Sequence, residues 1–189
     1  SEPEAHLAGR RLHCPRGKAL GGSSSINGMV YVRGNPLDFD RWEEEGAKGW
    51  AYRDVLPYFR RAEARREGAD SYRGGDGPLA TMRGPKRNPL YDAFIEAGRQ
   101  AGYPVSADLN GEQQEGFGRL DMTVRRGVRW SAANAYLRPA MKRPNLSVVT
   151  HALATRSEFE GRRAVGVHYQ RGGAAHLARA RREVILCGG

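Results

Sequence analysis

Residues 15–28, PRGKALGGSSSING, constrain the fold more than any other stretch, because adjacent glycines permit backbone conformations that most residues disfavour. Gly21 and Gly22 allow the main chain to approach a ligand closely. Ser23 and Ser24 can cap a helix that follows, and their hydroxyl groups can also donate hydrogen bonds to an anion. The segment therefore predicts either a phosphate-holding loop at a helix N-terminus or a structural turn.

Neighbouring residues distinguish this segment from a linker and from the standard nucleotide loops. Arg16 and Lys18 supply positive charge, and the apolar sequence INGMVYVRG that follows is not typical of a flexible linker. Lys18 precedes an alanine rather than a serine or threonine, so the segment is not a Walker A loop. A G-x-G-x-x-A spacing at residues 75–80 contains Pro78 and lacks the flanking strand and helix of a dinucleotide fingerprint. The anion-binding loop and the structural turn both stay open.

Capping residues and apolar spacing predict three helices and a further short one before Pro144. Residues 68–87 are rich in glycine, proline and charge, and they predict a long loop. The predicted helices cover Asn35–Gly46, residues 52–68, Asn88–Gly102 and a few residues after Ser131. The predicted buried face of the third helix consists of Leu90, Phe94, Ala97 and Ala101.

The pattern changes after Pro144, where short strands alternate with glycine turns. Turns at Glu160–Gly161 and Arg171–Gly173 predict an antiparallel meander. The last apolar run, Glu183–Leu186, ends in two glycines and predicts a fourth, buried strand. Helices and loops followed by a meander indicate a mixed α/β fold.

The chain carries a net charge of +10, which raises the question of nucleic acid binding. Its arginines are scattered along the sequence and many have acidic neighbours, as in RRAEARREGAD. No basic stripe with interleaved aromatic residues is present, so we do not expect specific nucleic acid binding. A noncatalytic domain whose basic surface binds polyanions remains an alternative.

Cysteine and histidine spacing gives no sign of a disulfide framework or a metal site. Cys14 and Cys187 are predicted to be buried, reduced thiols. His151 and His168 fall within the predicted meander and are expected to be ordinary strand residues. No apolar run reaches 18 residues, so no membrane-spanning helix is predicted. The first residues include neither a methionine nor the apolar core of a signal peptide, and we expect the chain to be part of a longer protein.

GKALGGSSSINGMVYVRGNPLDFDRW, residues 17–42, resembles the first signature of the glucose–methanol–choline (GMC) flavoprotein oxidoreductases. DLNGEQQEGFG, RWSAANAYLRP and REVILCGG continue the likeness, which covers nearly all 189 residues. It is closest to the choline dehydrogenase branch of the family. The resemblance implies an incomplete FAD/NAD(P)-binding-type fold in an internal fragment. The family's first dinucleotide motif and its catalytic histidine segment would lie outside this chain.

The resemblance also implies a division into domains. Residues 1–34 and 144–189 would belong to the FAD-binding domain. Residues 35–143 would form a helical and loop region with part of the substrate domain, and they include a lid-like loop at 68–87.

The resemblance implies that FAD lies along residues 16–30. It would be bound noncovalently, because Ile26 stands where some members carry a flavin-linked histidine. Gly28 would leave room for the substrate carbon beside the flavin ring. No residue of this chain is implied as catalytic. The implied cofactor-binding residues are Arg16, Lys18, Gly21, Gly22, Ser23, Asn27, Gly28, Met29, Val30, Ala154 (at the adenine) and Gly188 (at a close turn).

The implied reaction is oxidation of a primary alcohol, choline to betaine aldehyde, by hydride transfer to flavin N5. Another aliphatic or polyol alcohol as substrate, and O₂ in place of a quinone or dye-type acceptor, stay open. A choline site would require aromatic rings around the ammonium group. Trp42, Trp50, Tyr58 and Trp130 are better explained by packing within the helical region. The resemblance implies a bacterial-type intracellular protein, cytoplasmic or peripheral on the inner face of a membrane, with homo-oligomerisation left open.

Overall fold

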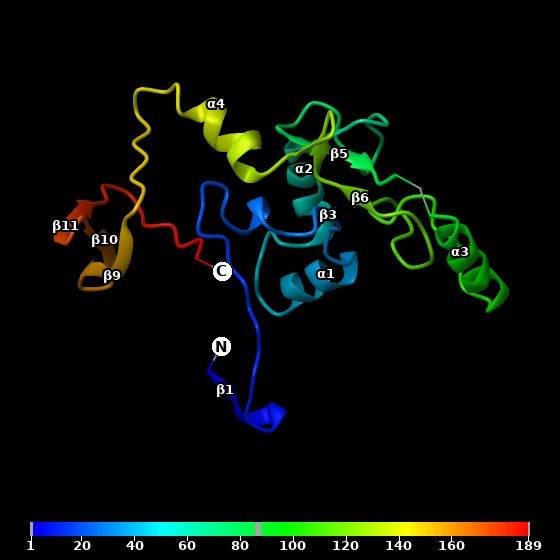
Figure 1. The fold of residues 1–189 in the computed structure, drawn as a ribbon, viewed down its shortest axis with the longest axis horizontal. Helices are drawn as coiled ribbons and strands as arrows, with labels where there is room; N and C mark the ends of the chain where they lie inside the picture. The colour runs from blue at the N-terminus through cyan, green and yellow to red at the C-terminus, as the bar shows by residue number, and fades with distance from the viewer. Residues whose placement is uncertain (1, 86–87, 189) are drawn as a thin grey trace. The chain divides into compact units, whose positions relative to one another are not determined.

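The computed structural model describes residues 2–85 and 88–188, which divide into two units, Ser1–Ala140 and Met141–Gly189. Short strands and helices make up the first unit, and a β-meander makes up the second (Figure 1), so the predicted mixed α/β class is confirmed. Among the described residues, no helix combines the length and apolar character needed to cross a membrane.

The helices and strands of the first unit are short. In chain order they are β1 (Pro3–Glu4), a 3₁₀ turn (Ala5–Leu7), β2 (Arg10–Arg11), a 3₁₀ turn (Gly22–Ser25), β3 (Val30–Tyr31), α1 (Pro36–Glu44), α2 (Tyr52–Ala62), β4 (Glu63–Arg65), β5 (Leu79–Arg83), α3 (Leu90–Gln100), β6 (Asp121–Met122), β7 (Val124–Arg125), β8 (Val128–Arg129), a π-helical turn (Ala133–Leu137) and α4 (Arg138–Ala140).

A four-stranded sheet with the order β3-β6-β5-β4 organises the first unit (Figure 1). β4 and β5 run parallel with Ala64 opposite Ala80, whereas the other neighbouring strands are antiparallel. β3 is an edge strand and follows the glycine- and serine-rich segment directly along the chain. The sheet therefore holds the C-terminal end of that segment in place.

Helix α1 forms as its capping residues predict. Asn35 caps it, because its Oδ1 accepts the Leu37 N–H at 2.9 Å, and Pro36 occupies the first turn. Its buried Phe39 packs against Phe59 of α2, with the ring centroids 5.7 Å apart. Helix-to-helix contact between aromatic rings thus joins α1 to α2.

Helix α2 ends at Ala62, so the prediction that it continues to residue 68 is wrong. Glu63 adopts extended backbone, with φ −97° and ψ 139°, and begins β4. Glu63 is fully buried and its carboxylate takes part in a network of ion pairs. A helical Glu63 on an exposed turn could not make those contacts, and the tertiary interaction overrides the local helix preference.

Glu63 and Arg73 form the central ion pair of the first unit. Both side chains are fully buried, with Glu63 Oε1 2.5 Å from Arg73 Nη2. Arg33 places a second guanidinium 2.8 Å from Glu63 Oε2, and the Thr81 hydroxyl donates to Glu63 Oε1 at 2.6 Å. The carboxylate is therefore surrounded by donors, as a buried charge requires.

Arg73 extends the network to two further carboxylates. Its Nη2 lies 2.6 Å from Asp121 Oδ2 in β6, and its Nη1 lies 2.6 Å from Asp108 Oδ1. Asp108 also receives Arg65 Nη2 at 3.3 Å. We call these residues the buried ion network: Arg33, Glu63, Arg65, Arg73, Asp108 and Asp121.

The network shifts the titration of its carboxyl groups. Burial alone would raise the pKa of Glu63, but hydrogen bonds from Arg73 and Thr81, with the nearby guanidinium charges, lower it overall. Burial likewise opposes ionisation of Asp108, whereas the Asn110 N–H and the charge of Arg73 lower its pKa. Since both folded values are depressed, their contribution to stability is present above about pH 4–5 and is lost as pH falls through the folded pKa values.

Residues 68–87 are not loop throughout, because Leu79–Arg83 forms β5. This strand pairs with β4 on one side and with β6 on the other, so two neighbours supply its backbone hydrogen-bond partners. Sequence composition alone does not reveal those partners. Residues 86 and 87 of the predicted loop lie outside the described residues.

The predicted buried face of α3 is wrong. Leu90 is 69% exposed and Phe94 is 65% exposed, and Ala97 and Ala101 are also exposed. Instead the buried position is Gly98, where a Cβ would lie 2.4 Å from the Phe117 ring. Because Gly98 has no side chain, the Phe117 ring can pack directly against α3 at this position.

The second unit is a three-stranded antiparallel meander with the order β11-β10-β9. It comprises β9 (Leu153–Glu160), β10 (Arg163–Arg171) and β11 (Ala174–Arg179), so the two predicted turns are confirmed. The predicted fourth strand, Glu183–Leu186, is wrong. Among the described residues no neighbouring strand pairs with it, and Ile185 is 74% exposed.

The cysteine prediction also needs correction. Cys14 and Cys187 are free, as expected, but both are exposed rather than buried. Each lies in a segment without helix or strand, so no packed layer covers the thiol.

Replacing Arg73 by methionine is expected to lower the free energy of unfolding by about 3–5 kcal/mol, because Glu63 and Asp121 would keep their buried charges without their partner. Urea unfolding followed by tryptophan fluorescence measures the change. The matched control is Arg41→Met, which removes the exposed Arg41–Asp38 pair and should change stability little. Equal effects of the two substitutions would contradict a central role for the network.

Candidate functional site

The glycine- and serine-rich segment forms a tight turn rather than the start of a long helix. Gly22–Ser25 is a single 3₁₀ turn, so the serines do not cap a helix, and of the two local conformations left open by the sequence the structural turn is the one observed. Gly21 and Gly22 have φ values of 90° and 53°, which favour glycine. A Cβ at Gly17 would lie 2.1 Å from the Gly22 carbonyl oxygen, so the chain folds back on itself here.

The serine hydroxyls hold this turn together. Ser23 Oγ accepts the Gly17 N–H at 3.2 Å, and Ser25 Oγ donates to the Leu20 carbonyl at 2.8 Å. Ser24 Oγ accepts the Ala132 N–H at 2.9 Å, which connects the turn to the segment before the π-helical turn. The serine hydroxyls therefore stabilise the turn itself, a role that differs from the helix capping and anion binding expected of Ser23 and Ser24 from the sequence.

Asn27–Val30 leads from the turn into the sheet. Asn27 Oδ1 accepts the Met29 N–H at 3.0 Å, and Met29 has a left-handed φ of 64°. The Met29 carbonyl accepts the Thr123 N–H at 2.8 Å, and Val30 then pairs with Met122. The segment is therefore anchored to β6 at its C-terminal end.

Arg129 is a residue of this site that sequence reasoning missed. Its Nη1 donates to the Asn27 carbonyl at 2.6 Å and to Asn27 Oδ1 at 2.9 Å. The same nitrogen lies 3.3 Å from the Ser24 carbonyl. One guanidinium from β8 thus ties the serine turn to Asn27, across about a hundred residues of sequence. No sequence pattern indicates that Arg129 contacts Ser24 and Asn27.

The outer side of the segment is open. Arg16, Lys18, Asn27, Gly28 and Val30 are exposed, and so are Ser23 and Ile26. A Cβ added at Gly28 would meet no heavy atom within 4 Å. Neither packing nor a left-handed backbone therefore demands glycine there, unlike at Gly17 and Gly21. An open glycine in a rigid segment is suited to close approach by a ligand.

Ala154 and Gly188 belong to the second unit. Ala154 lies in β9 opposite Tyr169, and Gly188 lies in the segment after β11. Both are exposed. The first unit therefore gathers nine of the predicted cofactor-binding residues on one segment, and the other two lie in a separate unit.

The remaining sequence candidates have local structural contacts. His168 in β10 lies with Nε2 2.5 Å from Glu158 Oε2 of β9, and its hydrogen bond lowers the pKa of Glu158. His151 precedes β9, at a φ of 54°, rather than lying in a strand. In the described part of the chain, no group of three histidine, cysteine or acidic residues is placed to hold a metal ion.

The aromatic candidates are less buried than predicted. Trp42, Trp50 and Tyr58 are exposed, although Trp42 packs edge-on against both Phe39 and Trp50. Trp130 has a different role, since its Nε1 donates to the Pro78 carbonyl at 2.8 Å. Packing between rings accounts for Trp42, but the outer faces of these residues have no cover among the described residues.

Comparison with known proteins gives consistent results. The profile described as GMC oxidoreductase matches residues 5–189. Oxygen-dependent choline dehydrogenases of Sinorhizobium medicae and Sinorhizobium fredii are 60% and 58% identical over 98% of this chain. The chain spans about a third of their length, 34% in each case.

Solved structures show the same relationship. Pyridoxine 4-oxidase from Mesorbium loti superposes with a TM-score of 0.86 at 32% identity, over 95% of this chain and 36% of that one. An FAD-dependent oxidoreductase from Chaetomium thermophilum superposes with a TM-score of 0.88 at 28% identity, over 100% of this chain and 35% of that one. The chain belongs to the GMC oxidoreductase family.

Proposed function

We propose that this chain forms one side of the FAD site of an enzyme that oxidises a primary alcohol, with choline as the substrate. The observation that carries the proposal is the rigid, open segment at residues 16–30, in a chain that matches the GMC profile almost throughout. Arg129 and β6 fix this segment from the protein side, which leaves its other side free for a cofactor.

The residues present fit FAD. Gly28 provides a place where a flat ring could lie against the main chain, because nothing in the fold fills the position of a Cβ. Arg16 and Lys18 supply positive charge near Gly21, Gly22 and Ser23, where we place the pyrophosphate. FAD, when bound, supplies the hydride acceptor for the alcohol. The apolar Ile26 offers no nucleophile for a covalent link.

The remaining assignments follow the same proposal. We place the flavin ring beside Asn27, Met29 and Val30, and the adenine beside Ala154, with Gly188 at a close turn. Residues 1–34 and 144–189 would belong to the FAD-binding domain, and 35–143 to the substrate side. The groups that take the hydroxyl proton are assigned to parts of the protein beyond this chain.

Choline as substrate and oxygen as acceptor are supported by the names of the relatives in Sinorhizobium. Pyridoxine 4-oxidase among the structural neighbours supports the alternative of a different alcohol as substrate. The choline dehydrogenase relatives are bacterial, and we extend the proposal to an intracellular enzyme, in the cytoplasm or at the inner face of a membrane.

A full-length protein containing this chain is expected to bind flavin, release it on acid precipitation, and show flavin bleaching with choline under anaerobic conditions. A neutral isostere, 3,3-dimethylbutan-1-ol, controls for recognition of the ammonium group, and pyridoxine tests the alternative substrate. Reoxidation with O₂ and with a dye compares the acceptors. Colourless protein with salt-sensitive retention on DNA would instead support the polyanion-binding alternative.

Arg129→Ala is expected to weaken FAD binding by roughly tenfold or more, because charge-assisted hydrogen bonds to Asn27 and Ser24 are lost and the segment loosens. Fluorescence titration of the apoprotein with FAD measures the dissociation constant. The matched control is Arg138→Ala, an exposed arginine of α4. If both variants bind FAD as the parent does, Arg129 does not position the segment.

Gly28→Ala is expected to leave thermal stability nearly unchanged, since the added methyl group meets no protein atom. It should nevertheless slow flavin reduction by an order of magnitude or more, because the methyl group would crowd the ring. Stopped-flow absorbance and thermal unfolding provide the two readouts. Gly74→Ala is the contrasting control, because its Cβ would lie 1.8 Å from the Arg60 carbonyl oxygen and should destabilise the fold. Normal flavin reduction in Gly28→Ala would place the flavin elsewhere.

A further inference from the structure

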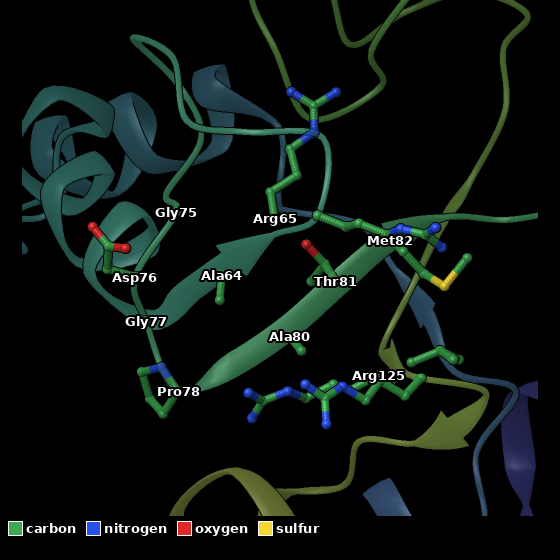
Figure 2. A pocket seen from close by; sticks show the side chains of 13 residues that line it. Ala64, Arg65, Gly75, Asp76, Gly77, Pro78, Ala80, Thr81, Met82 and Arg125 are labelled. Atoms are coloured by element: carbon green, nitrogen blue, oxygen red, sulfur yellow. The ribbon is translucent and has the colours of Figure 1, made fainter.

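A hollow of about 610 Å³ lies against the β4–β5 part of the sheet (Figure 2). Its floor contains Ala64 and Ala80, which are register partners on the two parallel strands. Figure 2 shows both methyl groups on the same face as the Arg125 side chain, with the Thr81 hydroxyl on the other face. Small side chains on the floor therefore leave the space empty, and its volume suits a small molecule.

The walls of this hollow carry a surplus of positive charge. Four arginines line it, but Arg65 directs its guanidinium to Asp70 and Asp108. Within residues 2–85 and 88–188, the other three arginines form no salt bridge; these are Arg66, Arg125 and Arg126.

The acidic residue in the lining does not neutralise these charges. Asp76 is the acidic residue that lines the hollow, and Figure 2 shows its carboxylate on the outer side of the Gly75–Pro78 loop, away from Ala64 and Ala80. The interior of the hollow is thus left to the unpaired arginines. A guanidinium is a planar fork of donors that matches the oxygens of a carboxylate or a phosphate.

The Arg125 side chain is held in place by contact with an aromatic ring. Its guanidinium carbon lies 4.8 Å from the centre of the Trp130 ring, a cation–π contact. Trp130 is itself fixed, because its Nε1 donates to the Pro78 carbonyl and its N–H donates to the Thr123 carbonyl. Preorganisation of this kind lowers the entropy lost when a ligand binds.

The β7–β8 turn presents the neighbouring arginine at the same rim. Arg126 and Gly127 both have left-handed φ values, 51° and 76°, in a two-residue hairpin turn between Arg125 and Val128. Arg66 enters from the end of β4, where its N–H donates to the Thr81 carbonyl. Cations from two separate chain segments therefore face one concave space.

We propose that this hollow binds a small multivalent oxyanion, a phosphorylated or polycarboxylate metabolite, through Arg66, Arg125 and Arg126. None of the residues assigned to FAD lines it, so the proposal stands apart from the function proposed above. The concave shape and volume favour a small molecule over an extended polyanion, which would follow a stripe of charge.

The test uses the full-length protein with its flavin bound, and two probes, pyrophosphate and citrate, at physiological ionic strength. Isothermal titration calorimetry is expected to show saturable binding of at least one probe, and the stronger probe identifies phosphate or carboxylate as the preferred source. Arg125→Gln should weaken that binding roughly tenfold, because a charge-assisted contact is lost. Arg138→Gln, with the same change of net charge, should not weaken it.

A second variant tests the space rather than the charge. Ala80→Val narrows the floor and keeps every arginine, and it should also weaken binding, while the flavin absorbance of all the variants stays that of the parent. Absence of saturable binding for both probes would overturn the proposal. So would an equal loss of binding in Arg138→Gln and Arg125→Gln, since that result indicates a general effect of net charge.

Discussion

The pairing of Glu63 with Arg73 is the interaction on which the first unit depends. Two fully buried charges can persist only where each is matched, and this pair is matched by Asp121 of β6 and by Arg33, which follows β3. It determines where α2 ends, because Glu63 has to leave the helix to reach Arg73. Among the described residues of the first unit the buried apolar side chains are few, Phe39 and four alanines, so these charges define the arrangement of the strands.

The same network reaches the candidate site through Asn110. This side chain accepts the Arg33 N–H at 2.8 Å and donates to the Tyr31 carbonyl at 3.0 Å, so it fixes the chain where β3 ends. Arg129 fixes the other end of the segment at Asn27. Residues 27–33 are therefore held by hydrogen bonds at both ends. The side of this segment that we propose to face the ligand does not have to pack against the protein to keep the segment in place.

Local features of this fold were predictable from sequence, and contacts between distant segments were not. Asn35 caps α1 as its position indicates, since capping depends on neighbours only a few residues away. The end of α2 and the strand at Leu79–Arg83 depend on partners far along the chain. The same holds for Arg129, whose bonds to Asn27 follow no periodic pattern. For the candidate site, the glycine-rich segment is visible in the sequence, whereas the groups that hold it rigid are not.

The charge balance of the buried network has a consequence for the solvents in which this protein can fold. Its three guanidiniums and three carboxylates cancel, while the chain as a whole carries +10. Dissolved ions screen exposed pairs such as Arg41–Asp38 within a few ångströms, but they reach a buried pair much less. Concentrated salt is therefore expected to weaken the repulsion among surface arginines while it changes the ion pairs at the centre of the sheet much less.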